Sequence, residues 1–99
     1  MANEYEELMK RAQGLQERVQ AAQDELGRMT LRGVASNGQA IVDMDGKYNL
    51  LDLTIAPELL SEGVGVLRAV IKSAFDDAKG KTDMAIDRVM SVATEGMPV

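Results

Sequence analysis

Apolar residues in the first third of the chain recur at alternating spacings of three and four residues. Such a repeat has a period of 3.5 residues, which is the period of a coiled coil. It predicts one helix over residues 4–28, about 37 Å long, with a narrow apolar stripe along one side. Because so thin a stripe cannot enclose a core, this helix needs a second helix to pack against. The stripe consists of Tyr5, Leu8, Ala12, Leu15, Val19, Ala22, Leu26 and Met29.

Residues 30–55 follow a different pattern, in which apolar and polar side chains alternate. Alternation with one polar face is typical of antiparallel strands. The dipeptides Asn37-Gly38 and Asp45-Gly46 interrupt the pattern. Both favour two-residue hairpin turns, because Asn, Asp and Gly tolerate positive φ. We therefore predict three antiparallel strands, over about residues 30–36, 39–45 and 48–55.

The last third of the chain returns to helical spacing. Pro57 stands where a helix begins, since its fixed φ suits the first turn. The apolar stripe that follows predicts a long helix over about residues 61–94, and we expect a kink or a short break at Lys79-Gly80-Lys81. The first long helix leads into the sheet at its C-terminal end, and the second long helix leaves the sheet at its N-terminal end. We therefore expect their far ends, residues 4–11 and 85–95, to pair as an antiparallel arm.

Together these elements define an α+β fold: a long helix, a three-stranded antiparallel meander and a second long helix. With 99 residues, the chain has room for one domain, residues 1–99. Chains of this size bury a limited share of their surface, so a partner that covers more of it would add stability. The two edge strands of a three-stranded sheet are natural places for such pairing.

Composition narrows the chemistry. The chain has no Cys and no His, which excludes disulfides, thiol nucleophiles, the usual zinc sites and every catalytic triad that needs imidazole. Asp43, Asp45, Gly46 and Asp52 fit part of a calcium-binding loop, but Ile41 stands at its first position and a hairpin explains the same residues. No apolar run approaches the roughly 20 residues of a membrane span. We expect a soluble intracellular protein that is not an enzyme and has no metal or cofactor.

Charge is unevenly distributed. Eleven Lys and Arg against sixteen Asp and Glu give a net charge of −5, which repels nucleic acid at long range. Residues 1–18 and 79–99 are nearly neutral, whereas residues 19–78 hold the acidic excess. If the protein binds DNA, the contacts should come from the basic side chains of the two nearly neutral segments: Lys10, Arg11, Arg18, Lys79, Lys81 and Arg88.

Four strings resemble the YbaB/EbfC family of nucleoid-associated proteins over nearly the whole chain: AIVDMDGKYNLLDLTI, IAPELL, AFDDAKGK and SVATEGMPV. The resemblance implies an α–β–β–β–α protomer and a homodimer joined through its sheet region. It also implies helical arms likened to tweezers, and duplex DNA bound weakly with little sequence preference. Where the family more often has Asn-Asp, this chain has Asp76-Asp77, and it lacks a basic N-terminal leader.

The resemblance also implies where function lies. We expect the dimer core to include Leu51, Leu53, Ile55 and Leu67, and the protein to reside in the cytoplasm on the nucleoid. A second hypothesis stays open, because some relatives are linked to secretion or export machinery and fold alone does not fix function. In that case the same scaffold would be a protein-interaction module that does not bind DNA. Unpaired Arg and Lys along the arms favour the first hypothesis, and exposed Leu or Met there favours the second.

Overall fold

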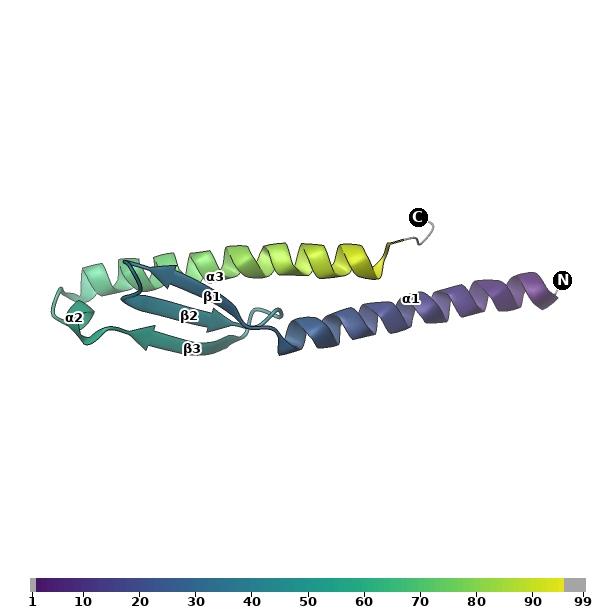
Figure 1. Cartoon of the computed structure of the whole chain (residues 1–99), viewed down its shortest axis with the longest axis horizontal. Helices are drawn as coiled ribbons and strands as arrows, with labels where there is room; N and C mark the ends of the chain where they lie inside the picture. The colour runs from purple at the N-terminus through teal and green to yellow at the C-terminus, as the bar shows by residue number, and fades with distance from the viewer. Residues whose placement is uncertain (1, 96–99) are drawn as a thin grey trace.

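Figure 1 shows a computed structural model of the chain, an elongated molecule with extents of 73 × 19 × 17 Å. The structure describes residues 2–95. The predicted order of helix, three strands and helix is confirmed, with one short additional helix before the last long one. The elements are α1 (Ala2–Arg28), β1 (Leu31–Ala35), β2 (Ala40–Met44), β3 (Leu50–Ile55), α2 (Pro57–Leu60) and α3 (Val64–Ala93).

The three strands form one antiparallel sheet in the order β1-β2-β3. α3 packs against β1 and β2 on one face of the sheet. The alternation predicted for the middle strand is confirmed, because Ala40, Val42 and Met44 point into the core. They are joined there by three buried residues of the helices, Leu59, Ala74 and Ala78.

Gly33 determines how closely α3 approaches the sheet. A Cβ atom at this position would lie 2.1 Å from the carbonyl oxygen of Ala74 and 2.4 Å from the nitrogen of Ala78. The backbone of α3 therefore rests directly on β1, and only glycine leaves room for it. Ala74 and Ala78, one helical turn apart, present small side chains to the same contact and are fully buried.

Both loops of the sheet differ from the predicted two-residue hairpins. Ala35 pairs with Ala40, so the first loop has four residues, and Ser36 and Asn37 both have positive φ. In the second loop Tyr48 has positive φ. Before this loop, the pairing of β2 with β3 shifts register between Asp43 and Met44. The prediction of two-residue turns was wrong in both loops, and in the second loop the Asp45 side chain, rather than a partner strand, accepts the N–H groups of Lys47 and Asn49.

The carboxylate of Asp45 holds the second loop together. It accepts hydrogen bonds from the backbone N–H of Lys47 at 2.8 Å, the backbone N–H of Asn49 at 3.0 Å and the Asn49 side-chain amide at 3.0 Å. These donors, the backbone N–H of Asn49 first among them, lower the pKa of Asp45. The loop conformation therefore depends on the ionised form of one carboxylate.

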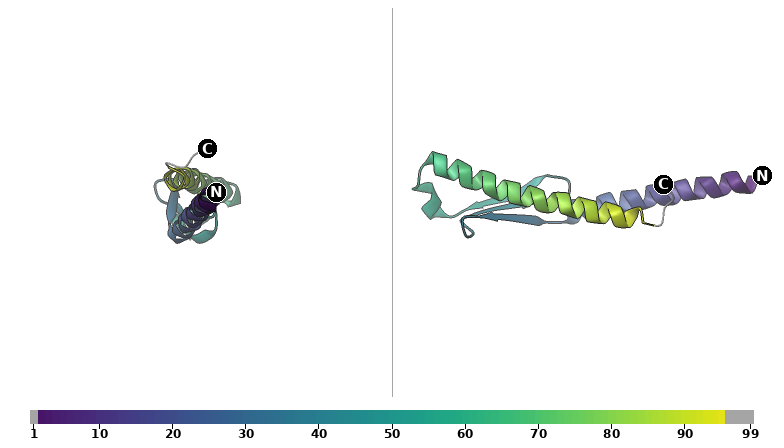
Figure 2. Two further views of the ribbon diagram at one scale, coloured as in Figure 1. Left: turned by 90° about the vertical axis from the view of Figure 1, so that its right-hand side faces the viewer. Right: turned by 90° about the horizontal axis from the view of Figure 1, so that it is seen from above.

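The long helices pair in a different offset from the predicted one. Residues 4–11 do not meet residues 85–95; instead Ala22 and Leu26 of α1 pack against Val89 of α3. The reason is that the first half of α3 lies on the sheet, whereas α1 lies entirely beyond the sheet (Figures 1 and 2). The N-terminal half of α1 therefore extends past the last turn of α3. The short break that the sequence allowed at Lys79-Gly80-Lys81 does not occur, since α3 runs unbroken through it, and Figures 1 and 2 show no sharp bend in this helix.

We expect Gly33→Ala to lower the free energy of unfolding by about 3 kcal/mol, because the added methyl must displace the backbone of α3. Urea unfolding followed by circular dichroism measures this change. Gly80→Ala is the matched control within α3, where a Cβ meets nothing within 4 Å. It should raise the free energy of unfolding by up to about 1 kcal/mol. Equal effects of the two substitutions would contradict the packing described here.

Asp45→Asn tests the second loop. Because the folded-state pKa of Asp45 lies below its ordinary value, ionised Asp45 stabilises the fold above about pH 4, and this contribution is lost as the pH falls through the lowered value. We expect the variant to be less stable than the wild type at pH 7. Between pH 5 and pH 2.5 the free energy of unfolding should also fall less in the variant than in the wild type. Asp87→Asn, the same change at an exposed side chain of α3, is the matched control and should lower the free energy of unfolding at pH 7 less than Asp45→Asn does.

Candidate nucleic-acid interface

We use the name arm for α1 together with residues 85–93 of α3. Its two helices meet through a small apolar cluster in which Ala22, Leu26 and Val89 are buried. Met29, Ile86, Met90 and Ala93 pack around them. At the end of α3, Arg18 Nη1 donates a hydrogen bond to the carbonyl oxygen of Glu95 at 3.3 Å. The arm is thus a two-helix unit only over its half nearest the sheet.

The direction of the arm is set by the loop between β2 and β3. The N–H of Gly46 donates to the carbonyl oxygen of Leu26 at 2.8 Å, and a Cβ on Gly46 would come within 2.5 Å of that same oxygen. From the other side of the loop, the hydroxyl of Tyr48 donates to Asp83 on α3, which raises the pKa of Tyr48. One loop therefore connects the C-terminal end of α1 to α3.

The predicted basic residues fall into distinct places. Lys10 and Arg11 are exposed on the half of α1 that extends past α3. Arg18 lies beside the C-terminal end of α3. Lys81 and Arg88 line one shallow groove between the start of β1 and α3. Lys79 is exposed on α3.

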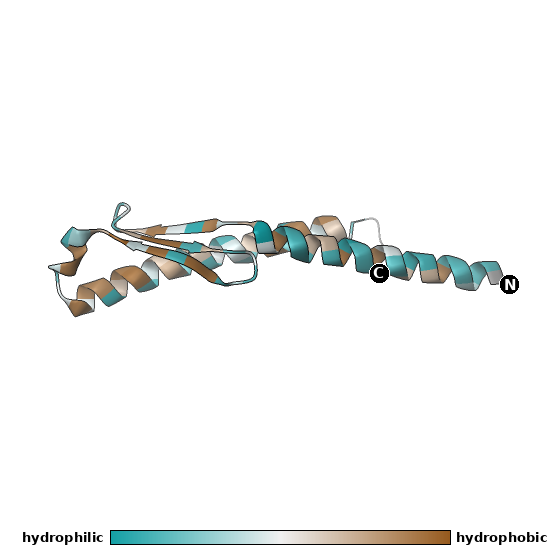
Figure 3. Cartoon of the chain, turned by 90° about the horizontal axis from the view of Figure 1, so that it is seen from below, coloured by the Kyte–Doolittle hydropathy of each residue, from teal (hydrophilic) through white to brown (hydrophobic). Residues whose placement is uncertain are grey.

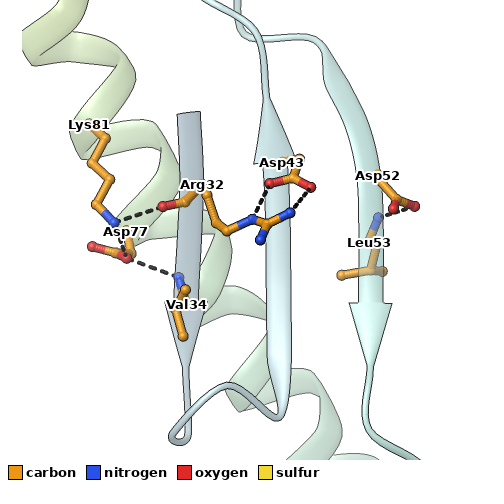
Figure 4. Close-up of polar contacts among 7 residues, drawn as sticks. All are labelled: Arg32, Val34, Asp43, Asp52, Leu53, Asp77 and Lys81. Carbon is orange, nitrogen blue, oxygen red and sulfur yellow. Dashed lines mark hydrogen bonds and ion pairs between the residues drawn. The ribbon is translucent and has the colours of Figure 1, made fainter. Parts of the chain in front are cut away.

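Lys81 has a structural role that its sequence position did not reveal. Its Nζ donates to the carbonyl oxygen of Arg32 at 2.7 Å and lies 3.3 Å from Oδ2 of Asp77 (Figure 4). Asp77 in turn accepts the N–H of Val34 at 2.9 Å. The pKa of Asp77 is lowered by the Val34 N–H first and by Lys81 second. Two side chains of α3 thus occupy backbone groups on the free edge of β1, which closes that edge to a further strand.

The opposite edge of the sheet is open. Leu53 lies opposite Val42 in the ladder and therefore on the inner face, yet 40 % of it is exposed because α3 covers mainly β1 and β2. Leu51 is 52 % exposed, and the N–H of Leu53 is bound only by the carboxylate of the preceding Asp52, at 2.9 Å. Two further predicted dimer-core residues, Ile55 and Leu67, are half-buried against the protomer's own core.

The other face of the sheet carries an ion pair between neighbouring strands. Arg32 donates to both carboxylate oxygens of Asp43, at 2.8 and 3.1 Å, and this bonding lowers the pKa of Asp43 (Figure 4). Asp43 and Asp45 therefore bind protein donors of the strand pair and of the loop, as the hairpin interpretation of these residues predicts. Over residues 2–95, no group of three or more His, Cys, Asp or Glu side chains is placed to hold a metal ion.

The hydropathy of the arm is mixed along its length (Figure 3). Tyr5 and Leu8 of α1 are more than 60 % exposed, as are Met84 and Val92 on α3. In the part of the chain that the structure describes, neither long helix is apolar enough over a sufficient length to cross a bilayer. The arm therefore carries the two features that distinguish the competing hypotheses, exposed basic residues and exposed apolar ones.

The architecture and the known relatives define the class. The protein is an α–β–β–β–α protomer with a projecting helical arm, and its sequence matches the YbaB/EbfC DNA-binding family over residues 1–97. The chain belongs to this family, as its sequence motifs predicted.

Its relatives agree with that assignment. The chain is 32 % identical over 92 residues to a nucleoid-associated protein of Legionella pneumophila, covering 93 % of this chain and 82 % of that protein. It is 35 % identical over 92 residues to a nucleoid-associated protein of Rhodospirillum rubrum, covering 92 % and 86 %. An uncharacterized protein from Helicobacter pylori shares the fold, with a TM-score of 0.76 at 18 % identity over 84 % of this chain and 88 % of that one.

Proposed function

We propose that this protein is a nucleoid-associated protein that binds duplex DNA as a homodimer, weakly and without marked sequence preference. The observation that carries the proposal is the exposed set of basic residues on the arm and along α3. Within residues 2–95, Lys10, Arg11, Lys79 and Arg88 form no ion pair, in contrast to Arg32, Lys72 and Lys81. Unpaired cations can neutralise DNA phosphates, and this releases the counterions that are condensed on the DNA.

A homodimer supports this function because it presents every cation twice. The open edge at β3 is the surface that we assign to the dimer, since its apolar residues Leu51 and Leu53 are exposed and the edge of β1 is closed by Asp77 and Lys81. Exposed leucines beside unpaired strand edges are a common basis for pairing between chains. Leu60 and Val64 add exposed apolar surface at the same end of the molecule.

Electrostatics favours contacts through the arms. A dimer carries a net charge of about −10, and the arm and residues 29–84 of each protomer are acidic to the same extent, with a net charge of −2 each. Among the described residues, however, no Lys or Arg of the arm forms an ion pair, whereas Arg32, Lys72 and Lys81 in residues 29–84 do. Binding by a few point charges on helix surfaces engages the backbone of DNA rather than base edges. Affinity should therefore be modest and nearly the same for different sequences. Residence on the nucleoid would follow from binding of this kind.

The dimer is tested by light scattering. We expect a mass of about 21 kDa for two chains of 10.7 kDa at micromolar concentration. Leu53→Lys should give a folded monomer, because it places a charge on the shared surface. Val34→Lys is the matched control, since Val34 is 42 % exposed on the closed-edge strand, and it should remain a dimer. A wild-type mass of one chain would refute the dimer.

DNA binding is tested by anisotropy titrations of labelled duplexes over a range of salt concentrations. If two or three cations of each protomer engage, four to six phosphates are neutralised and log K should fall against log salt with a slope of about −4 to −5. Arg11→Gln should weaken binding to all sequences alike and reduce the slope by about 1 to 2 in the dimer.

Asn37→Asp is the matched control for Arg11→Gln. It makes the same change of net charge on the β1–β2 loop, at the end of the sheet remote from the arm (Figure 1). It should alter affinity less than Arg11→Gln does. Lys47, on the other loop of the sheet, cannot serve as such a control. Its side chain lies beside Gly27 at the base of the arm.

The second candidate function is a protein-interaction module. The exposed Tyr5, Leu8 and Val92 of the arm, and the exposed Met84 just before it on α3, favour it. If the wild-type protein binds no duplex even at about 50 mM salt, where electrostatic attraction is strong, the DNA proposal fails and this candidate takes its place.

A further inference from the structure

The apolar stripe of α1 extends beyond the helix that it packs against. Its C-terminal residues Ala22, Leu26 and Met29 meet α3, which ends at Ala93. The same spacing of three and four residues continues toward the N-terminus through four residues of the projecting half, which we call the free seam: Tyr5, Leu8, Ala12 and Leu15. The free seam is a continuation of an interface that already exists within the chain.

No described residue of α3 or of the sheet covers the free seam. Tyr5 is 67 % exposed and Leu8 63 % exposed. Residues 3–17 form a rod of about 22 Å, and Figure 2 shows it projecting past the last turn of α3. A stripe of 3.5-residue period on an isolated rod is suited to another helix with the same period, because large side chains then fit between those of the neighbour.

We propose that the free seams of two copies of this chain pair antiparallel, with the two-fold axis between the seams at the level of residue 10. In this register Tyr5 faces Leu15 of the second copy, and Leu8 faces Ala12 of the second copy. Both contacts occur twice. Four layers of apolar contact therefore cover the free seam along its whole length.

Apolar contact and charge together select this register, because a shift of one heptad away from the sheet would leave two apolar layers among the described residues instead of four. The residues that flank the seam on one side are Glu4, Arg11 and Arg18, seven residues apart. Antiparallel pairing about Lys10 brings Glu4 beside Arg18 of the second copy at both ends, and only the central Arg11 meets its own equivalent. A shift of one heptad toward the sheet would instead place Arg11 beside Arg18 twice and Glu4 beside Glu25 twice, which is repulsive throughout. In a parallel pair Glu4 would lie beside Met9 and gain no opposite charge.

The pairing involves neither the edge of β3 nor DNA, so it is a second contact between copies. If the proposed function holds, two dimers joined by their arms would hold two duplexes, or two parts of one duplex, close together. The arm would then act both as a DNA contact and as a bridge.

The absence of cysteine from the chain allows a direct test of the register. Leu8→Cys and Ala12→Cys variants are mixed under reducing conditions and then mildly oxidised, without DNA. We expect the covalent product to join one chain of each kind, and each variant alone to give much less. Glu6→Cys mixed with Gln13→Cys is the matched control, because these positions lie on the outer side of the same helix and should not crosslink.

Three results would overturn the proposal. Efficient crosslinking of Leu8→Cys with itself would indicate a parallel pair. Equal crosslinking in the Leu8/Ala12 mixture and the control mixture would indicate random collision. No crosslink in the full chain, together with its appearance after removal of residues 96–99, would assign the free seam to the chain's own tail.

Mass provides a second readout. With rising concentration the wild type should approach four chains, about 43 kDa, whereas Leu8→Gln with Leu15→Gln should stay at two. Leu53→Lys should keep the crosslink between residues 8 and 12 although it loses the sheet-mediated dimer. Failure of DNA binding or of that dimer would therefore be seen separately from failure of the arm pairing.

Discussion

The contact between the backbone of α3 and Gly33 is the constraint on which the rest of this molecule depends. Because α3 lies directly on β1, it covers β1 and β2 and leaves β3 largely uncovered. The close approach also brings Asp77 and Lys81 within hydrogen-bonding distance of the outer edge of β1. One contact between two backbones thus gives the sheet a closed edge and an open one. A bulkier residue at position 33 would change both.

The same contact sets the geometry of the arm. The turns of α3 that lie on the sheet cannot also pair with α1, so only its last turns, around Val89, are left for α1. α1 is nearly as long as α3 but lies entirely beyond the sheet, and its N-terminal half therefore has no intramolecular partner among the described residues. The two helices have similar lengths, but only α3 spends part of its length on the sheet. The N-terminal half of α1 therefore projects as a rod beyond the end of α3.

Sequence patterns were sufficient for the order and type of the long elements, because periods of 2 and 3.5 residues report directly which faces are buried. They were insufficient where one side chain replaces backbone pairing, as Asp45 does in the loop that puts Tyr48 at positive φ. They also could not give the offset between α1 and α3, which depends on how much of α3 the sheet occupies. The candidate basic residues were identified from the sequence by comparing the net charge of successive segments. The engagement of Lys81 with β1 was missed, since it follows from packing between segments 49 residues apart.

The two ends of the molecule differ in how their cations are paired, and this difference suits each end to a different kind of partner. At the sheet end Arg32, Lys72 and Lys81 are held in ion pairs and leucines are exposed on β3, a combination that suits an apolar contact. The arm also has more acidic than basic side chains, but among the described residues none of its guanidinium and ammonium groups forms an ion pair, and they lie next to an apolar seam. Phosphates and a second helix can use different sides of that rod, because Lys10 projects away from the seam while Leu8 and Leu15 lie on it. Helical periodicity therefore allows one short segment to serve two contacts at once.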